Sequence, residues 1–551
     1  MSRSTLTIEI DPAYLRKRLW QIIPGLLSWT TLIGLTVMSF ALPFWVAIFI
    51  IAYDVYLLVR IVYMTIHLLY AYRRLKEYEG INWIDRCKGV SENITAYEKA
   101  LMKILAQPVS GRQRRQVKRH YREVRELIQS GHAILDWKDV QHAVVVPTYD
   151  ESLIVLRSTI NALVATTFPK ERMHIAIGFE ERAGQEVKDK AATLQKEFGH
   201  IFGTFLTTFH PDGLPGEKRV KSANASWAIQ QLEKTLTDSG VAIDHIVVSN
   251  FDSDTVVQPE YFSYLTYSFI THEDRYRLSY QPIPVYSNNL WDAPAFSRVI
   301  AMGSTFWQMI ESTRPERLVT FSSHSMTLKT LREVGYWQKD IVSEDSRIFW
   351  QALLHYDGNY RTEPLYVTVS MDAALAPSWW QTLKNQYKQK RRWAWGIENF
   401  PFLVEGFWAN KKIPLTTKWV YLFRTLEGHY SWATAAIIVA GLGWLPVIFG
   451  GASFHSTVLS YSLPFVTRSL MTVAMSGLII SATLTLLLVP RKSESQGFWK
   501  YSLLILQWVL VPLIATLLSA FPALDSETRL MLGRDLHFNV MQKTRREKGS
   551  T

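Results

Sequence analysis

The stretch Ile246-Val-Val-Ser-Asn-Phe-Asp-Ser-Asp-Thr255 decides the fold of the central part of the chain. Its β-branched start, Ile246 to Val248, predicts a buried strand, and Asp252 and Asp254 follow where that strand ends. Two carboxylates at the end of a strand suit a hard divalent cation, which prefers oxygen ligands and leaves positions open for phosphate oxygens. Taken alone, the pair is more typical of a solvated turn in which Asp254 caps a following helix. The neighbouring elements are therefore needed to distinguish a metal site from such a turn.

Strands and helices alternate on the N-terminal side of this stretch. Predicted strands cover Ala143–Val146, His174–Gly178 and Phe202–Phe209, and predicted helices cover Leu153–Leu163, Gln185–Phe198 and Lys218–Lys234. This alternation predicts a mostly parallel sheet with helices on both faces.

Ligands of such sheets bind at the carboxyl ends of the strands. Three acidic pairs fall at these ends: Asp150/Glu151, Glu180/Glu181 and Asp252/Asp254. Like charges repel at close range, so six converging carboxylates indicate a metal ion and a ligand that donates hydrogen bonds. The alternative is a set of separate, solvated turns.

Two motifs follow on the C-terminal side. Glu344 and Asp345 precede an apolar helical run. Either they cap and stabilise the start of that helix, or Asp345 is a general base held at the helix N-terminus. Further on, a predicted helix carries Gln389, Arg392 and Trp393 on one face. Arginine suits a diphosphate and an indole suits the apolar face of a sugar, although a basic helix lying on a membrane surface has the same composition.

The two ends of the chain are strongly apolar, whereas its middle has the composition of a soluble protein. The 551 residues are 48% hydrophobic and carry a net charge of +12. Runs of spanning length are Ile22–Phe40, Leu42–Tyr70, Ala433–Gly451, Ser469–Pro490 and Ser502–Leu524. Basic residues flank the first two runs on both outer sides, which predicts a hairpin with both flanks in the cytoplasm. The single cysteine, Cys87, cannot form an internal disulfide, which fits a reducing compartment.

A dense basic stripe lies between the first hairpin and the predicted sheet, from Arg112 to Arg125. Nucleic acid is one partner for such a stripe. The adjacent membrane hairpin favours a solvated helix or one near anionic lipid headgroups, so we predict membrane lipid and no nucleic acid as partners.

The ordered motifs resemble those of membrane-embedded family 2 glycosyltransferases, the group that contains cellulose and hyaluronan synthases. The matching residues are Val146-Pro-Thr-Tyr-Asp-Glu151, Lys221-x-x-Asn224, Asp252-Ser-Asp254, Glu344-Asp345 and Gln389-x-x-Arg392-Trp393. The resemblance covers residues 141 to about 410 and implies an α/β GT-A (Rossmann-like) catalytic domain combined with α-helical transmembrane segments.

The resemblance also implies roles for single residues. Catalysis falls to Asp345 as general base, with Glu344, and to Arg392 and Gln389 at the diphosphate leaving group. Nucleotide-sugar binding falls to Pro147, Tyr149, Asp150, Glu151, Glu180, Lys221 and Asp252. Asp252 and Asp254 would hold Mg²⁺ or Mn²⁺, and Trp393 and His324 would contact the acceptor, with a structural histidine as the alternative for His324.

The sequence departs from the family pattern at two places and matches it loosely at a third. Ser226 stands where many relatives have asparagine, and the second strand ends in Glu180-Glu181 where relatives more often have two aspartates or Asp-Gly. The tail segment Phe538-Asn-Val-Met-Gln-Lys543 resembles the gating loop of cellulose synthases, with Met541 in place of threonine. A gating role requires a cytoplasmic tail, which three C-terminal spans do not provide unless Pro512 and Pro522 break the last run into a re-entrant pair.

These observations predict six regions and one main function. The regions are a transmembrane hairpin (1–71), a basic helical region (72–140), the GT-A domain (141–395), interfacial helices (396–430), a C-terminal transmembrane region (431–524) and a basic tail (525–551). The predicted function is inverting, metal-dependent transfer of a sugar from a UDP-linked nucleotide sugar to a growing polysaccharide, coupled to export through a bacterial-type inner membrane. Transfer of one sugar to a lipid carrier and non-catalytic binding of a nucleotide or glycan are the alternatives.

Overall fold

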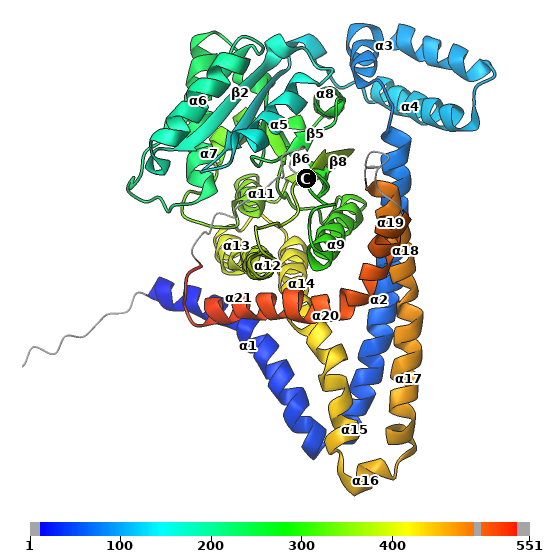
Figure 1. Ribbon diagram of the computed structural model, residues 1–551. Helices are drawn as coiled ribbons and strands as arrows, with labels where there is room; N and C mark the ends of the chain where they lie inside the picture. The colour runs from blue at the N-terminus through cyan, green and yellow to red at the C-terminus, as the bar shows by residue number, and fades with distance from the viewer. Residues whose placement is uncertain (1–11, 490–497, 537–551) are drawn as a thin grey trace, which may run out of the picture. The chain divides into compact units, whose positions relative to one another are not determined.

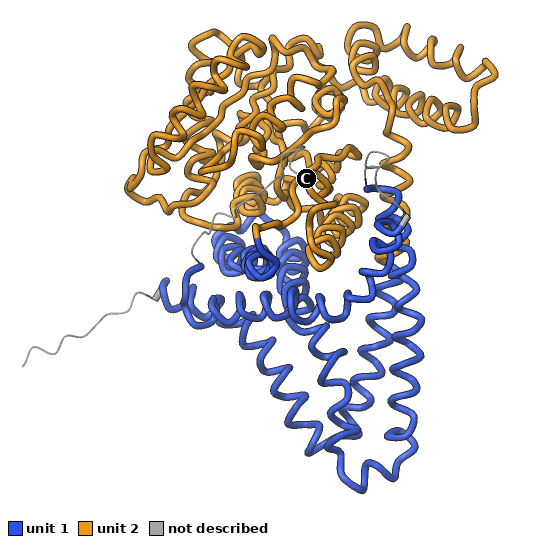
Figure 2. Tube along the Cα trace, viewed as in Figure 1, with its two compact units in different colours: residues 1–63, 378–539 blue, residues 64–377, 540–551 orange. Residues whose placement is uncertain are grey.

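The computed structural model describes residues 12–489 and 498–536. The chain forms two compact units (Figure 2). One consists of residues 64–377, and the other combines the described residues before 64 with those from 378 onward. Helix α2 (Pro43–Tyr78) contributes to both units, because the division falls after Tyr63. The tail segment 538–543 lies outside the described residues, as do Arg491 and Lys492.

The 64–377 unit is built on one eight-stranded sheet with the order β3-β2-β1-β4-β7-β6-β8-β5. Its first half is parallel and contains β1 (Gln141–Pro147), β2 (Met173–Glu180), β3 (Thr204–His210) and β4 (Ile246–Asn250). The runs of β-branched residues are fully buried here, as expected for strands that are covered on both faces. The predicted parallel sheet is confirmed in this half.

The second half of the sheet is mixed. The short β7 (Ser325–Thr327) pairs antiparallel with β4 and with β6 (Leu278–Val285). Next to β6 lies the parallel β8 (Arg361–Ser370), which pairs antiparallel with the two-residue β5 (Val256–Val257). A Rossmann-like parallel half joined to this mixed half is the arrangement expected of a GT-A fold.

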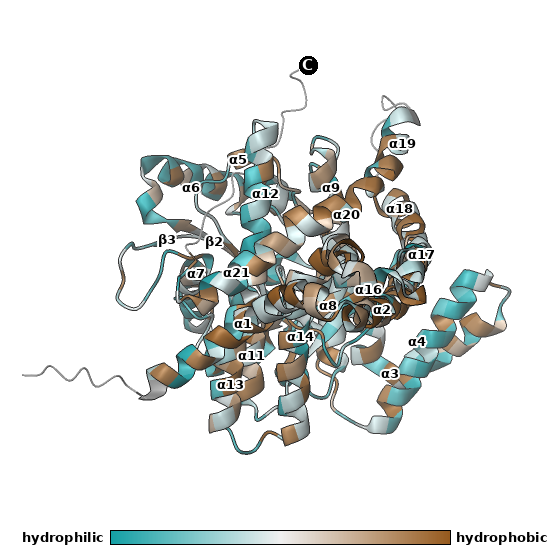
Figure 3. Cartoon of the chain, turned by 90° about the horizontal axis from the view of Figure 1, so that it is seen from below, coloured by the Kyte–Doolittle hydropathy of each residue, from teal (hydrophilic) through white to brown (hydrophobic). Residues whose placement is uncertain are grey.

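Helices cover both faces of the parallel half, as predicted. The strand order reverses direction after β3, so the helices that connect β1 to β2 and β2 to β3 lie on one face and the helix between β3 and β4 lies on the other. The first two are α5 (Leu153–Val164) and α6 (Gln185–Phe198), and the third is α7 (Lys221–Asp238); Figure 3 shows them on opposite sides of β2 and β3. The reversal places a topological switch point between β1 and β4, where ligands of such sheets bind.

Six more helices complete this unit: α3 (Trp83–Ala106), α4 (Gly111–Ser130), α8 (Tyr261–Thr271), α9 (Ala295–Ser312), α10 (Leu328–Glu333) and α11 (Glu344–His355). Short 3-10 turns begin several of the strands, such as Ile243–His245 before β4. The core runs from the sheet through α8 to α3, where Trp83 stacks on Tyr264 with ring centroids 4.0 Å apart.

The second unit is helical (Figure 1). It contains α1 (Pro12–Ala41), the first part of α2, α12 (Trp379–Ala394), α13 (Asn399–Ala409), α14 (Leu415–Ala440), α15 (Leu445–Phe449), α16 (Gly451–His455), α17 (Val458–Ala474), α18 (Ser476–Leu488), α19 (Phe498–Leu506), α20 (Val511–Ala515) and α21 (Phe521–Met531).

Four stretches of the described chain are helical, long and apolar enough to cross a membrane: Tyr14–Ala41, Pro43–Tyr78, Val458–Leu488 and Trp499–Met531. A fifth is obtained if Leu415–Ala440 and Leu442–Phe449, bent by 45°, count as one span. The two N-terminal helices agree with the predicted hairpin. Trp419–Tyr430, which the sequence suggested as a separate interfacial segment, is continuous with the following apolar residues in α14.

The last apolar stretch is helical but irregular. Pro512 and Pro522 both stand at the starts of short helices, α20 and α21, and the π-helical turn Thr516–Ala520 lies between them. Proline removes a backbone donor and interrupts regular hydrogen bonding at such positions. In Figure 1, α21 runs across α1 rather than alongside it.

Candidate active site

Three carboxylates surround the ammonium group of Lys221, the first residue of α7. Its Nζ lies 2.5 Å from Asp252 Oδ1, just after β4, and 3.7 and 3.8 Å from the carboxylates of Asp345 and Glu344 in the first turn of α11. The structure therefore brings together four predicted site residues from three motifs that are far apart in the sequence.

The three carboxylates dominate the electrostatics at Lys221. Burial lowers the pKa of the Lys221 ammonium, but the carboxylates of Asp252, Asp345 and Glu344 outweigh burial and hold this pKa above its ordinary value. The ammonium lies within 4 Å of all three carboxylates. The Lys221 side chain is 12% exposed and that of Glu344 only 4%, which makes the interactions stronger than they would be in water.

The second oxygen of Asp252 accepts a hydrogen bond from Ser322, with 2.6 Å between Oγ and Oδ2. Ser322 lies in the turn before β7, where the next residue, Ser323, has a φ of +65°. Few residues other than glycine adopt this left-handed conformation, and the turn directs Ser322 towards the end of β4. The sequence predicted no role for Ser322, because no spacing rule separates this serine from Ser323 and Ser325.

Asp254 occupies a different environment from Asp252. It is fully buried, and its Oδ2 accepts the backbone N–H of Asp372 at 2.9 Å. No helix begins at the next residue, since the two-residue β5 follows, so the alternative interpretation of Asp254 as a helix cap is wrong. Asp254 thus anchors the β4 loop to the segment after β8.

A metal ion at this place would depend on few protein ligands. Among the residues that the structure describes, no three His, Cys, Asp or Glu side chains form a group that could hold a metal. Asp252, 24% exposed, fits the type of site in which Mg²⁺ or Mn²⁺ is bound by one or two carboxylates together with ligand phosphates. The donor set is compatible with such a metal, and Asp254 as its second ligand stays a prediction.

Asp345 is positioned by the start of α11. Its backbone carbonyl accepts a hydrogen bond from Thr320 at 2.6 Å, and a carboxylate at a helix N-terminus is stabilised by the helix dipole. The side chain is 26% exposed, while its Oδ1 is buried near Lys221 and His324 without a hydrogen-bond donor. A carboxylate that is accessible and incompletely hydrogen-bonded can accept a proton from a bound hydroxyl group.

His324 is fully enclosed behind Asp345. One ring nitrogen, Nδ1, lies 3.0 Å from the carbonyl of Phe321, and Nε2 accepts the indole N–H of Trp337 at 3.4 Å. Burial lowers the pKa of His324, which favours the neutral ring that this bonding requires. Such an environment is typical of a structural histidine, and contact of His324 with an acceptor stays a prediction.

Glu151 joins the loop after β1 to the loop after β4. Its carboxylate accepts hydrogen bonds from the Tyr149 backbone N–H at 2.8 Å and from Ser253 Oγ at 2.9 Å. Pro147, the last residue of β1, is buried and lies opposite Gly178 of β2. The two loops that flank the topological switch point are therefore held together by one side chain.

Asn224 of α7 connects the ends of β1 and β2. Its Nδ2 donates to the carbonyls of Gly178 at 2.7 Å and Thr148 at 3.2 Å. This approach requires glycine at 178, because a Cβ there would lie 2.3 Å from Asn224 Oδ1. Ser226, where relatives often have asparagine, is buried and donates to the Trp337 carbonyl at 3.0 Å.

The other acidic residues at the strand ends have basic partners. Asp150 is exposed and pairs with Lys190 at 3.3 Å, while the buried Glu180 contacts Arg182 at 3.2 Å and His210 at 3.4 Å. Arg182 also lies over the ring of Tyr149 at 4.9 Å. The predicted convergence on a metal ion and a bound ligand is not seen for Asp150 and Glu180, because cationic side chains neutralise these two carboxylates.

His210 at the end of β3 links Glu180 to Glu217. Burial lowers the pKa of its imidazole, but hydrogen bonds to the two carboxylates outweigh burial and raise the pKa above its usual value. Lys339 in turn contacts Glu217 at 2.8 Å. This charged network fixes the rim of the site on the side of β3.

Gln389, Arg392 and Trp393 lie on α12 in the helical unit. Arg391 points to the opposite side of α12, where it contacts Asp525 of α21 at 2.9 Å and its carbonyl accepts the Ser526 hydroxyl. Lys390 lies over the rings of Trp393 and Trp432, and burial lowers the pKa of its amine to about 8. The docking of α12 on α21 thus orients the Gln389–Trp393 face away from α21.

Comparisons with known proteins agree with these motifs. The sequence model of glycosyl transferase family group 2 matches residues 247–523, which is half of the 551 residues. Poly-β-1,6-N-acetyl-D-glucosamine synthase of Staphylococcus epidermidis is 25% identical over 142 residues, or 26% of this chain. The match spans only 31% of that relative's length.

Solved structures of glycosyltransferases are also similar to this chain. The mannosyltransferase PcManGT from Pyrobaculum calidifontis, in complex with GDP-Man and Mn²⁺, aligns with 73% of this chain and 99% of its own, at 12% identity and a TM-score of 0.38. Residues 1–349 of S. aureus TarS align with 62% of this chain and 90% of that one, at 12% identity and a TM-score of 0.34.

Proposed function

The chain belongs to glycosyl transferase family group 2, and from this premise we propose that it extends a polysaccharide with sugars taken from a UDP-sugar. The observation that carries the proposal is the cluster of Lys221, Asp252, Glu344 and Asp345 at the switch point of the sheet. The cluster supports the proposal because Asp345, the proposed base, and Asp252, the proposed donor-binding carboxylate, both lie within 4 Å of the Lys221 ammonium.

In the proposed reaction, Asp345 accepts the proton of the acceptor hydroxyl while the hydroxyl oxygen attacks the anomeric carbon of the donor. One base and one displacement invert the configuration at that carbon, so an α-linked donor yields a β-linkage. General-base assistance of this kind contributes about 10²–10⁴-fold to a rate. Glu344 and Lys221 would hold Asp345 in place, and Glu151 would keep the two donor-binding loops together.

The donor diphosphate would bind next to Asp252. A divalent cation held by Asp252, with Asp254 as the proposed second ligand, would supply positive charge to the leaving group. Tyr149, Asp150 and Glu180, with Pro147 shaping the end of β1, are the proposed contacts for the nucleoside. Gln389 and Arg392 are proposed to steady the diphosphate, and Trp393 to support the acceptor sugar.

We place the catalytic unit in the cytoplasm and the helical unit in a bacterial-type inner membrane. The basic residues Arg16–Arg18 before α1 and Arg73, Arg74 and Lys76 near the end of α2 support this orientation. Transmembrane helices joined to a cytoplasmic transferase would allow the product to be exported as it grows. A lipid-linked acceptor is the second form that the acceptor could take.

The test measures sugar incorporation by isolated membranes from a panel of labelled UDP-sugars, with Mg²⁺, Mn²⁺ or chelator, followed by sizing of the products. UDP-N-acetylglucosamine comes first, because the curated relative is named as an N-acetylglucosamine polymer synthase. Asp345→Asn is expected to lower incorporation by about 10²–10⁴-fold. Asp340→Asn, the same change at an exposed position nearby, is the control and should retain activity.

Three outcomes contradict the proposal in distinct ways. Full activity of Asp345→Asn would remove Asp345 from the chemistry. A small, lipid-extractable product would replace polymerisation with single transfer to a lipid carrier. UDP binding without incorporation or donor hydrolysis, in membranes supplied with a primer glycan, would leave only a binding function.

A further inference from the structure

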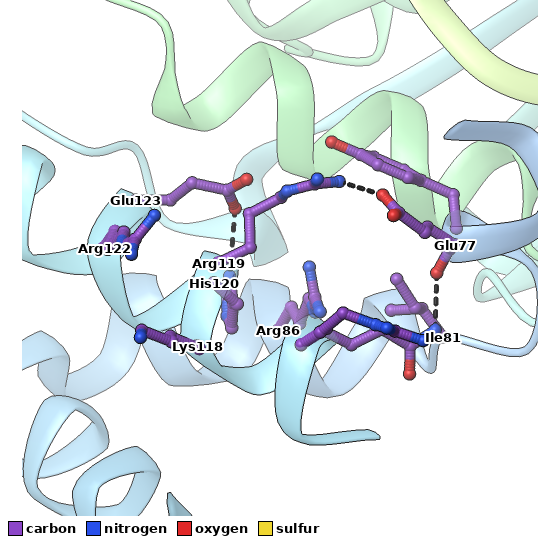
Figure 4. Close-up of a pocket in the computed structure, with 11 residues that line it drawn as sticks. Glu77, Ile81, Arg86, Lys118, Arg119, His120, Arg122 and Glu123 are labelled. Carbon is purple, nitrogen blue, oxygen red and sulfur yellow. Dashed lines mark hydrogen bonds and ion pairs between the residues drawn. The ribbon is translucent and has the colours of Figure 1, made fainter. Parts of the chain in front are cut away.

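A basic pocket lies away from the carboxylate cluster, between the end of α2 and the helices α3 and α4 (Figure 4). Its volume is about 250 Å³, which is several times that of one water molecule but below the usual range for nucleotide-sized ligands. Five of its lining residues are cationic: Arg86, Arg115, Lys118, Arg119 and Arg122.

Acidic residues balance only part of this charge. Arg119 pairs with Glu77, and Glu123 lies 3.2 Å from His120. In the part of the chain that the structure describes, Arg86, Arg115, Lys118 and Arg122 form no ion pair with a carboxylate. Arg86 instead lies over the Trp83 ring at 4.8 Å, and Figure 4 shows it in the middle of the group, between His120 and Ile81.

The pocket is fixed to the end of α2 by hydrogen bonds from α4. Arg112 donates to the Lys76 carbonyl at 2.6 Å, and Gln116 donates to the Glu77 carbonyl at 2.5 Å. These bonds satisfy carbonyl groups that have no partner in the last turn of a helix. The position of α4 is therefore tied to a helix that is long and apolar enough to cross a membrane.

The pocket begins a few ångströms beyond the headgroup layer, within reach of long basic side chains. The apolar run of α2 ends at Tyr70, and Glu77 lies seven residues further, or about 10 Å at 1.5 Å per residue. The headgroup layer extends roughly 5–8 Å beyond the hydrocarbon on each side of a bilayer. The exposed Arg115, Lys118, Arg122 and Arg125 follow one another at spacings of three and four residues, which places them along one side of α4 facing the solvent.

We propose that this pocket binds the phosphate headgroup of an anionic membrane lipid. Unpaired cations gathered at the end of a membrane helix attract anionic lipids, and arginine side chains match phosphate oxygens in geometry. The pocket has room for a phosphate group, and its position next to α2 favours a phosphate that is supplied by the membrane. The proposal does not rest on the transferase reaction.

The test titrates the full-length protein, in a neutral detergent at about 0.1 M salt, where surface charges still act over about 10 Å. Dioctanoyl phosphatidylglycerol is compared with dioctanoyl phosphatidylcholine and inorganic phosphate by calorimetry. Lys118→Gln/Arg122→Gln is expected to weaken phosphatidylglycerol binding about 25-fold, from about fivefold for each cation. The control, Lys99→Gln/Lys103→Gln, removes two exposed lysines from α3 outside the pocket and should change the affinity less than twofold.

Selective, saturable binding of phosphatidylglycerol that only the pocket variant loses supports the proposal. Equal binding of inorganic phosphate would overturn it in favour of a soluble phosphate ligand. Equal weakening by both double variants would reduce the effect to general surface charge, and the absence of phosphatidylglycerol binding would also refute it. If Lys118→Gln/Arg122→Gln does not purify as a folded protein, Arg115→Gln alone should weaken binding about fivefold.

Discussion

Replacing Lys221 with methionine removes an ammonium group that contacts the carboxylates of Asp252, Glu344 and Asp345. The ammonium lies 2.5 Å from Asp252 and within 3.8 Å of Asp345 and Glu344. Removal of one partner from a buried ion pair costs about 3–5 kcal/mol. Because Asp252 and Asp345 are about a quarter exposed, we expect the lower end of this range, about 3 kcal/mol.

This loss should appear in the thermal unfolding of the purified protein. At about 2–4 °C for each kcal/mol in a domain of this size, Lys221→Met should lower the Tm by about 6–12 °C. Lys234→Met, an exposed lysine on the same helix, is the matched control and should shift the Tm by less than about 2 °C.

A double variant tests whether charge is the cause. Lys221→Met removes one positive charge from the cluster, whereas Lys221→Met/Asp252→Asn removes one positive and one negative charge and so keeps the net charge of the native protein. The double variant should therefore be more stable than the sum of the two single changes predicts, by at least about 1 kcal/mol. Additive effects, or a native-like Tm for Lys221→Met, would refute the idea that the ammonium holds the cluster together.

Three further changes test the surroundings of the cluster. Gly178→Ala places a Cβ 2.3 Å from Asn224 Oδ1 and should destabilise the protein by about 1–3 kcal/mol, seen as a lower Tm; an unchanged Tm would contradict this close approach. Ser322→Ala removes the donor to Asp252 Oδ2 and should weaken Mn²⁺–UDP binding about tenfold in calorimetry, and an unaltered affinity would rule out a role in orienting Asp252. His210 has a raised pKa in the folded protein, so its contribution to stability is present below about pH 6.5 and is lost as the pH rises through the folded pKa. The Tm difference between the native protein and His210→Gln should therefore be larger at pH 6 than at pH 8.5. A Tm difference that does not depend on pH would argue against the ion pairs of His210.

The parallel half of the sheet was predictable because it follows local patterns. Runs of β-branched residues mark β1 and β4, and the loops after these two strands meet through Glu151 and Ser253, as the rule for parallel sheets requires. The short β5 and β7 have no such pattern, since two or three residues show neither periodicity nor length. Their pairing depends on tertiary contacts with β8 and with β4 and β6.

Within the site, the residue types were predictable but their partners were not. Asp252 and Asp254 look equivalent in sequence, yet one faces Lys221 while the other is buried against the Asp372 backbone. The difference arises from the direction of the loop after β4 and from a segment that is 118 residues away. Ser322 likewise reaches Asp252 only because Ser323 adopts a left-handed conformation that serine seldom takes.

The charge of the cluster sets a requirement on donor binding. Three neighbouring carboxylates repel a diphosphate at close range, so we expect binding beside Asp252 to draw on positive charge either from a divalent cation or from arginines such as Arg392. If the divalent cation supplies the charge, chelator should abolish UDP binding. If the arginine supplies it, Arg392→Gln should abolish UDP binding. Arg277→Gln, at the surface of the sheet unit, is the control. An affinity for UDP that neither treatment changes would show that the diphosphate binds away from these carboxylates, and the Asp252 assignment would then be wrong even though the fold and family are unaffected.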